Sequence, residues 1–368
     1  MKQTHTPTNR ILAIDLARGA SVFFVVIIHT LWMYGTVDTQ SNTWLGHIVH
    51  FMGKGTPMFL LAMGFSFCLS RKQDTKAIIK RGLELLAIGY GMNLFKFIVP
   101  YFLGLMPNNF VGAYGWEAPL TGAQLLYLFQ TGDILQLAGI TLLLMVFIHK
   151  FSNNKFIPLI LALITALATP IVRGIRLDIV GIDYLLDLLW GAEWNVYFAV
   201  FPWASFILVG MFFGLWYKEK NYNDRFIFTQ MFWIGVLCTA IGGGLSYYNF
   251  EYHFNDYFHL GPGGAVYLAG FNLILFCIAH LIGSYFPNNK FFDFLCYSSK
   301  RVTHLYVIQW VLVCWGMGFL GYQQHDAFGV LSILPFTLFA TYAVQYLYDT
   351  LKQKIKSQKQ KFTKPQSV

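Results

Sequence analysis

The sequence has few charged side chains for its length. Of its 368 residues only 12% are Asp, Glu, Lys or Arg, whereas 56% are hydrophobic and 18% are aromatic. The mean hydropathy is +0.51. A chain of this composition would expose large apolar surfaces in water, which excludes an ordinary soluble globular domain. We therefore expect lipid to be its main solvent.

Cysteine is also scarce, and long polar segments are missing. The five cysteines are Cys68, Cys238, Cys277, Cys296 and Cys314. All of them fall in apolar stretches or on the side assigned below to the cytoplasm, so no external disulfide framework is expected.

The longest external connections, at about 105–130, 174–195 and 249–261, are too short to fold alone. We predict one membrane domain over residues 1–351 and a basic, disordered cytoplasmic tail over 352–368.

Hydropathy instead shows about ten long apolar stretches. They lie roughly at 11–35, 45–70, 82–104, 131–149, 156–173, 196–217, 227–248, 262–286, 303–322 and 327–350. Each can cross a hydrocarbon core of about 30 Å as a helix that rises about 1.5 Å per residue. Lipid offers the backbone no hydrogen bonds, and the alternating pattern of a membrane barrel is absent. The predicted fold is therefore an all-α polytopic helical bundle with about ten transmembrane helices.

The basic residues predict how this bundle is oriented. If the N-terminus is cytoplasmic, most of the 26 Lys and Arg residues fall in the cytoplasmic connections and the tail. The positive-inside rule then places both termini in the cytoplasm, most simply at a bacterial inner membrane. The net charge of +9 is explained by this orientation. The charge therefore says little about partners, for which we expect membrane lipids and no nucleic acid.

Charged residues inside the first apolar stretch are the strongest functional signal. An ionised group at mid-membrane costs about 2.5–3.5 kcal/mol, so Asp15, Arg18 and His29 require an explanation. Arg18 and His29 are eleven positions apart, which places them on one helix face about 16 Å apart. Asp15 precedes Arg18 by three residues and can pair with it.

The second stretch adds His47, His50 and Lys54 at spacings of three and four. These residues share one helix face, and the two histidines lie at about the depth of His29. Three imidazoles could therefore meet near the external surface. A zinc site of these histidines is disfavoured because no acidic fourth ligand is evident, so we expect no metal. Each histidine alone is equally consistent with a hydrogen bond to a neighbouring helix.

Three segments resemble known membrane acyltransferases. The segment from Arg10 to Gly19 reads RILAIDLARG, and ten residues separate Arg18 from His29. This opening is similar to that of the acyltransferase type 3 family and of the heparan-alpha-glucosaminide N-acetyltransferase group. The segments GDILQLAG, at 132–139, and VFPW, at 200–203, resemble the second group.

One position departs from this pattern. Relatives often have a histidine directly after a Tyr-Val-Ile type run near the ninth helix. Here Tyr306-Val307-Ile308 is followed by Gln309, and His304 lies one turn earlier.

The resemblance implies transfer of an acyl group, most simply acetyl, from cytoplasmic acyl-CoA to a saccharide outside the membrane. It places His29 as the catalytic residue and Arg18 at the family's arginine. Imidazole titrates near neutral pH, which suits a base, and a guanidinium held by Asp15 suits the phosphates or amides of CoA. Lys54 is a further acyl-CoA candidate. Whether His29 acts as a base or carries the acyl group is left open, as is the choice of amine or hydroxyl acceptor.

Several other residues are candidates for supporting roles. They are His47, His50, Asp133 and Gln136 near the predicted site, and Trp190, Glu193 and Trp194 for acceptor binding in an external connection. Carboxylates and aromatic faces bind sugars, although aromatic residues are also common at membrane interfaces. Asp133 either caps its helix or orients His29.

Two other functions compete with the acyltransferase. A transporter or proton-coupled permease would use the same buried histidines and charges as a relay. A non-catalytic membrane scaffold would have no need of Arg18 and His29. The sequence leaves a homodimer possible and does not identify the acceptor.

Overall fold

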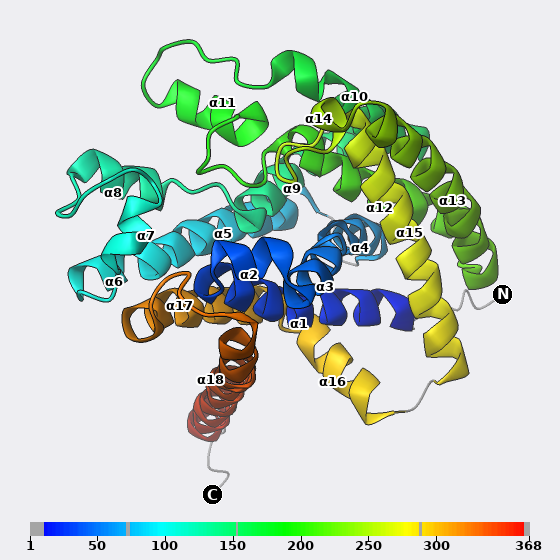
Figure 1. Ribbon diagram of the computed structural model, residues 1–368. Coiled ribbons are helices and arrows are strands. Elements are labelled where there is room, and N and C mark those ends of the chain that lie inside the picture. Colours follow the sequence, from blue (N-terminus) through cyan, green and yellow to red (C-terminus); the bar gives the residue numbers. More distant parts are fainter. Residues whose placement is uncertain (1–10, 71–73, 152–153, 287–288, 364–368) are drawn as a thin grey trace, which may run out of the picture.

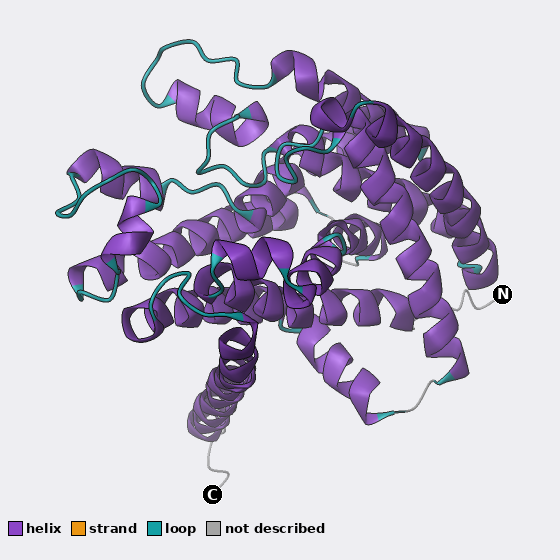
Figure 2. Ribbon diagram, in the orientation of Figure 1, coloured by secondary structure: helices purple, strands orange, loops and turns teal. Residues whose placement is uncertain are grey.

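The computed structural model describes residues 11–70, 74–151, 154–286 and 289–363, and in these ranges it consists of helices joined by loops (Figures 1 and 2). No β-strand occurs in the described ranges. The all-α fold class predicted from the sequence is therefore confirmed. Residues 1–10 and 364–368, which belong to the predicted cytoplasmic ends, lie outside these ranges.

Within the described residues, eight helical segments are long and apolar enough to cross a membrane. They are α1 (Leu12–Tyr34), Trp44–Leu69, Thr75–Phe102, α12 (Val200–Glu219), α13 (Asp224–Tyr248), α15 (Pro262–Tyr285), α17 (Val302–Leu320) and Ala327–Gln358. Two shorter apolar helices, α9 (Ile134–Phe151) and α10 (Phe156–Val172), cover the other two predicted stretches. The chain is thus a polytopic membrane protein.

Two of these segments are interrupted. Trp44–Leu69 consists of α3 (Trp44–Gly53) and α4 (Thr56–Leu69), which are separated at Lys54 and Gly55. In Thr75–Phe102, α5 (Thr75–Asn93) passes through the π-helical turn η1 (Leu94–Ile98) into α6 (Val99–Phe102). A π-turn changes the direction of the side chains that follow and is often found at functional sites.

Shorter helices lie in the connections. They are α2 (Val37–Asn42), α7 (Asn108–Gly112), α8 (Gly122–Phe129), α11 (Ile182–Trp190), α14 (Phe250–His253) and α16 (Lys290–Ser299). The last helix, α18 (Ala327–Thr363), extends beyond the predicted domain boundary at residue 351. Residues 352–363 are therefore helical, where the sequence predicted disorder.

Helix α1 lies in the middle of the bundle (Figure 1). It packs against α3, α4, α15, α16, α17 and α18. We call the side where α1 begins the Arg18 end and the side where it stops the His29 end. At the His29 end, the Thr36 amide donates to the His325 carbonyl, and the His325 amide donates to the Tyr34 carbonyl. These bonds join the end of α1 to the connection between α17 and α18.

Close helix packing depends on glycine, as in other membrane bundles. A Cβ atom at Gly64 of α4 would lie 1.8 Å from the Ile207 carbonyl oxygen of α12. A Cβ atom at Gly210 of α12 would lie 2.1 Å from the Leu61 carbonyl oxygen of α4. Each glycine thus lets the backbone of the other helix approach, so α4 and α12 form a rigid pair.

We expect Gly64→Ala to lower the free energy of unfolding by about 1–3 kcal/mol, because overpacking forces the two backbones apart. Thermal unfolding in detergent measures this. Gly244→Ala in α13 is the matched control, since no atom lies within 4 Å of a Cβ there. The control should melt at or above the wild-type temperature because alanine favours helix. Equal melting temperatures for Gly64→Ala and wild type would contradict the packing argument.

Candidate active site

His29 is buried near the end of α1, with 5% of its surface exposed. Its Nδ1 lies 3.0 Å from Oε1 of Gln309 on α17. Nε2 of Gln309 donates to the Tyr306 carbonyl at 3.0 Å, which turns the amide oxygen toward the imidazole. Because an amide oxygen only accepts, Nδ1 carries the hydrogen and Nε2 keeps a lone pair. The contact thus holds His29 as the tautomer that can take a proton at Nε2.

Aromatic rings fix the plane of this imidazole. The ring stacks on Trp310, with 3.6 Å between centroids and 23° between planes. Trp32 and Tyr306 pack beside it at centroid distances of 5.6 and 6.0 Å. Packing on several sides holds the His29 side chain in one rotamer.

A buried ion pair lies next to this stack. Nζ of Lys96 is 3.5 Å from Oδ2 of Asp133, and each side chain is only 2% exposed. Nζ also lies 3.9 Å from the centroid of the Trp310 ring that stacks on His29. A buried charge needs a partner of opposite sign, and each of these residues supplies one for the other.

Local structure positions both members of the pair. Lys96 lies in the π-turn η1, where the Phe95 carbonyl accepts a hydrogen bond from Nε1 of Trp315 at 2.7 Å. Asp133 precedes α9, and its Oδ1 accepts from the Ile134 amide at 2.7 Å and from the Tyr306 hydroxyl at 2.6 Å. Asp133 therefore connects the start of α9 to α17.

The contacts form a closed circuit, which we call the His29 cluster. Its members are His29, Gln309, Tyr306, Asp133, Lys96 and Trp310. They come from α1, η1, the residue before α9, and α17. Four segments that are far apart in the sequence thus meet at one buried site.

Gln136 lies at the edge of the cluster. Its Oε1 accepts from the Asp133 amide at 3.2 Å, and its Nε2 is buried without a hydrogen-bond partner among the described residues. A Cβ atom at Gly89 of α5 would lie 2.9 Å from the Gln136 amide group, so glycine makes room for it. Gln136 therefore brings an amide donor that is unpaired among the described residues to the edge of the cluster.

The other histidines predicted near the site are placed elsewhere. His47 and His50 are exposed on α3, whereas His29 is buried. His304 is exposed and packs edge-on against Tyr348, so it is Gln309 that contacts His29. No group of three or more His, Cys, Asp or Glu side chains could hold a metal ion within the described ranges.

Arg18 and Asp15 lie at the opposite end of α1. Asp15 is buried, and its Oδ1 accepts a hydrogen bond from Oγ of Ser299 on α16 at 2.7 Å. Arg18 is half-buried. Lys54 is half-buried at the break between α3 and α4, with Nζ 5.9 Å from the ring centroids of both Phe254 and Tyr267. These three residues are therefore not members of the His29 cluster.

The predicted acceptor loop reaches the cluster through its backbone. The Gly132 amide donates to the Asn195 carbonyl at 2.7 Å, and the Tyr197 amide donates to the Gly132 carbonyl at 2.9 Å. The ring of Tyr197 packs on that of Phe258 with 5.1 Å between centroids, and the ring of Phe258 packs on that of Trp32 with 5.9 Å between centroids. Burial, with a smaller contribution from Asp133, raises the pKa of Tyr197, so this tyrosine stays protonated.

The three acceptor candidates on this loop differ in their contacts. Trp194 is 63% exposed, and the centroid of its ring lies 6.2 Å from that of Tyr197. Nε1 of Trp190 donates to the Ile175 carbonyl, and Glu193 forms an ion pair with Arg176 at 2.9 Å. Of the three, Trp194 packs on Tyr197, whose amide donates to the carbonyl of Gly132, the residue before Asp133.

Lys96, Tyr306 and Trp310 were not assigned to the site from the sequence, and Gln309 was noted there only as a departure. Lys96 alone carried a signal, because it is a basic residue inside the apolar stretch at 82–104. Tyrosine, tryptophan and glutamine are ordinary in membrane helices, so only the fold reveals their contacts with His29.

We expect Lys96→Met to destabilise the protein by about 3–5 kcal/mol, because it leaves the Asp133 carboxylate buried without a cation. Adding Asp133→Asn to the same protein should restore most of the loss. Thermal unfolding in detergent gives the three values. Lys155→Met, which breaks the more exposed pair with Glu219, is the control and should cost about 1 kcal/mol or less. Additive losses for the double variant would show that Lys96 and Asp133 are not coupled.

Most of the chain resembles a known protein family. Residues 10–252 match the family model of the heparan-alpha-glucosaminide N-acetyltransferase catalytic domain. A comparison with curated proteins finds no match for the chain. The matched range is more than half of the chain and contains His29, Lys96 and Asp133. The chain therefore belongs to the heparan-alpha-glucosaminide N-acetyltransferase catalytic-domain family, a family of membrane acetyltransferases.

Proposed function

We propose that this protein transfers an acyl group, most simply acetyl, from cytoplasmic acyl-CoA to a saccharide at the external face of the membrane, with His29 as the catalytic residue. The observation that carries the proposal is the hydrogen bond from His29 to Gln309, because it leaves Nε2 with its lone pair. In this proposal the protein lies in a bacterial inner membrane and the Arg18 end of α1 faces the cytoplasm, as the positive-inside rule favours.

The reaction then needs one proton transfer in each direction. Nε2 of His29 takes the proton from the acceptor hydroxyl or amine while the acceptor atom attacks the thioester carbonyl carbon. The tetrahedral intermediate collapses, its carbon–sulfur bond breaks, and the imidazolium returns the proton to the CoA sulfur. The same lone pair would serve a route through an acyl-imidazole. Labelled acetyl that stays on the protein without acceptor would distinguish that route.

The rest of the cluster supports His29 electrostatically. Asp133 is a carboxylate in the same dry site, so it favours the imidazolium that forms during proton transfer. Lys96 balances the charge of Asp133 while His29 is neutral. Nε2 of Gln136, which lacks a partner among the described residues, is suited to donate to the oxygen that becomes negative in the intermediate.

The acyl-CoA donor would enter from the Arg18 end. Eleven residues of helix separate Arg18 from His29, or about 16 Å, which suits an extended thiol arm between a phosphate contact and the thioester. Ser299 holds Asp15 near Arg18. A cavity of about 450 Å³ where α4 ends and α5 begins is lined in part by Lys80, Arg81 and Glu84. Lys80 is paired with Glu84 at 3.9 Å, so Arg81 is the further cation that this cavity offers a phosphate.

A saccharide acceptor would approach from the His29 end. Tyr197, Phe258 and Trp32 form a continuous aromatic surface beside His29. Aromatic rings of this kind pack against sugar rings, and Trp194 extends the surface to solvent. The polar groups that a sugar needs include Glu193 in the same loop.

A proton-coupled permease is the second candidate. The buried pair of Lys96 and Asp133 favours it, because paired charges inside a membrane bundle are the groups that a proton relay uses. Flux of free sugar into proteoliposomes separates the two functions, since the acyltransferase predicts no net transport of unmodified acceptor.

Binding of acetyl-CoA gives the first test. Titration calorimetry of the detergent-purified protein should detect binding that weakens about tenfold or more in Arg18→Ala, because a charge-assisted contact contributes about 1.5–3 kcal/mol. His29→Ala should still bind. Lys155→Ala, at a basic residue of the same end that is paired with Glu219, is the matched control. Absence of binding to wild type would overturn the acyltransferase and favour the permease.

Gln309 provides a second test, read as release of CoA thiol with glucosamine as the probe acceptor. Gln309→Leu should lower the rate about a hundredfold, because a misoriented base costs about that much. Gln309→His should retain most activity, since its ring nitrogen can also accept the hydrogen of Nδ1. Both variants should bind acetyl-CoA as wild type does. A wild-type rate in Gln309→Leu would show that this contact does not position His29.

A further inference from the structure

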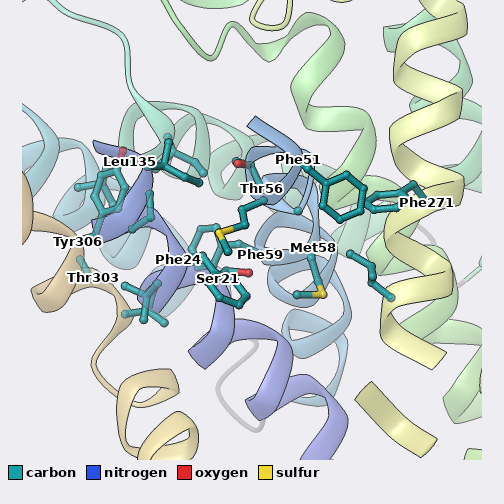
Figure 3. A pocket seen from close by; sticks show the side chains of 18 of the residues that line it. Ser21, Phe24, Phe51, Thr56, Met58, Phe59, Leu135, Phe271, Thr303 and Tyr306 are labelled. Carbon is teal, nitrogen blue, oxygen red and sulfur yellow. The ribbon is translucent and has the colours of Figure 1, made fainter. Parts of the chain in front are cut away.

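A cavity of about 340 Å³ lies beside α1, separate from the loops at the His29 end (Figure 3). Its wall is almost entirely hydrocarbon and comes from α1, α3, α4, α9, α15 and α17. The thiol arm of CoA contains amides, and amides buried in such a cavity would lack hydrogen-bond partners. The cavity is therefore better suited to a hydrocarbon chain than to the acyl-CoA arm.

One end of the cavity opens toward the membrane. Ile48 and Phe51 on α3 line it and are 46% and 57% exposed. Phe51 and Phe271 lie at this end in Figure 3, and Tyr306 lies at the other. Because α3 and α15 are parts of membrane-spanning segments, lipid surrounds the open end. A chain can thus enter sideways from the bilayer.

The inner end of the cavity meets the His29 cluster. Tyr306 lines the cavity and donates its hydroxyl hydrogen to Asp133. Ile134, the next residue after Asp133, also lines it. A single side-chain layer therefore separates a chain in the cavity from the proposed catalytic residues.

A cation lies beside the open end. Tyr267 stacks on Phe271, which lines the cavity, and Nζ of Lys54 is 5.9 Å from the Tyr267 ring centroid. Lys54 is half-buried and has no carboxylate partner within 4.0 Å among the described residues. A half-buried ammonium next to an apolar cavity in a membrane favours a ligand that joins a hydrocarbon chain to an anionic group.

We propose that this cavity binds the hydrocarbon chain of an anionic lipid whose phosphate meets Lys54, so that the acceptor is a lipid-linked saccharide. The inference rests on the proposed function and names its acceptor class. Lipid tails are as apolar as the cavity wall, so burial of the chain alone contributes little affinity. The phosphate contact selects the lipid and holds its head group beside the break between α3 and α4, so a saccharide attached to that phosphate is carried by a lipid bound in the same bundle as His29.

The test is photolabelling of the purified full-length protein in detergent. The probe is a hexadecyl phosphate with a diazirine in its chain, and hexadecanol with the same diazirine is the neutral comparison. Peptide mass spectrometry locates the label. In wild type, the phosphate probe should label the α1, α4 and α15 segments of the cavity more strongly than the alcohol does.

Two variants fill the cavity, and one matched control does not. Ser21→Phe and Thr303→Phe place a ring in the space that Figure 3 shows beside these residues, and both should lose cavity labelling. Ser332→Phe on α18 is the control. Ser332 is exposed outside the cavity, and like Ser21 it donates to the carbonyl four residues earlier. It should keep the labelling.

Lys54→Gln tests the phosphate contact separately from binding of the hydrocarbon chain. It should abolish the preference for phosphate and leave labelling by the alcohol probe unchanged. Uniform labelling of all lipid-facing helices, or unchanged cavity labelling in both filled variants, would overturn the proposal. Displacement of the probe by palmitoyl-CoA but not by unlabelled hexadecyl phosphate would also overturn it, because the cavity would then hold the acyl chain of the donor.

Acetyl-CoA calorimetry on the same samples keeps the two proposals distinct. If the lipid probe labels the cavity but acetyl-CoA does not bind, the proposed function fails and the lipid site stands. If acetyl-CoA binds and the filled variants bind it normally, loss of lipid labelling reports on the cavity and not on misfolding.

Discussion

A polar group inside a membrane bundle has to find its partners in the protein, because lipid supplies none. The His29 cluster meets this requirement by closing on itself: each member contacts two others, and the ion pair of Lys96 and Asp133 leaves no uncompensated charge. Its members come from α1, η1, the start of α9 and α17, so the cluster forms only when these segments are in register. The same contacts that prepare His29 therefore also fix the arrangement of the helices.

The helices pack very closely between α4 and α12 and loosely beside α1. This contrast determines where the bundle leaves room for a ligand. Glycines let α4 and α12 approach until no side chain fits between them. Beside α1, by contrast, large apolar side chains leave the open cavity that ends at Tyr306. Close packing on one side of α4 holds the helix rigid, and a rigid wall keeps the cavity from collapsing on the other. Position along α1 then separates the ends: Arg18 and Asp15 lie at one, and His29 at the other.

The helices could be predicted from the sequence because hydropathy depends on residues that are neighbours in the chain. His29, Asp133 and Gln136 were also found, since polar residues stand out in an apolar stretch. The partners of His29 were not found, because Gln309 lies 280 positions away and an isolated glutamine carries no signal. The helical spacing of His47 and His50 correctly places them on one face, but spacing does not tell which way that face points. The π-turn that carries Lys96 has no sequence signature either.

The matched family range ends at residue 252, whereas Tyr306, Gln309 and Trp310 close the cluster from beyond it. The matched part thus supplies His29 and the buried ion pair, and α17 supplies the groups that contact them. The geometry explains how Gln309 can occupy the position where the resemblance to the family led us to expect a histidine. What His29 needs there is a lone pair that accepts the hydrogen of Nδ1, and the bond from Gln309 to the Tyr306 carbonyl turns the amide so that its oxygen supplies that lone pair. An imidazole nitrogen supplies the same lone pair, so the position requires an acceptor and not a particular residue.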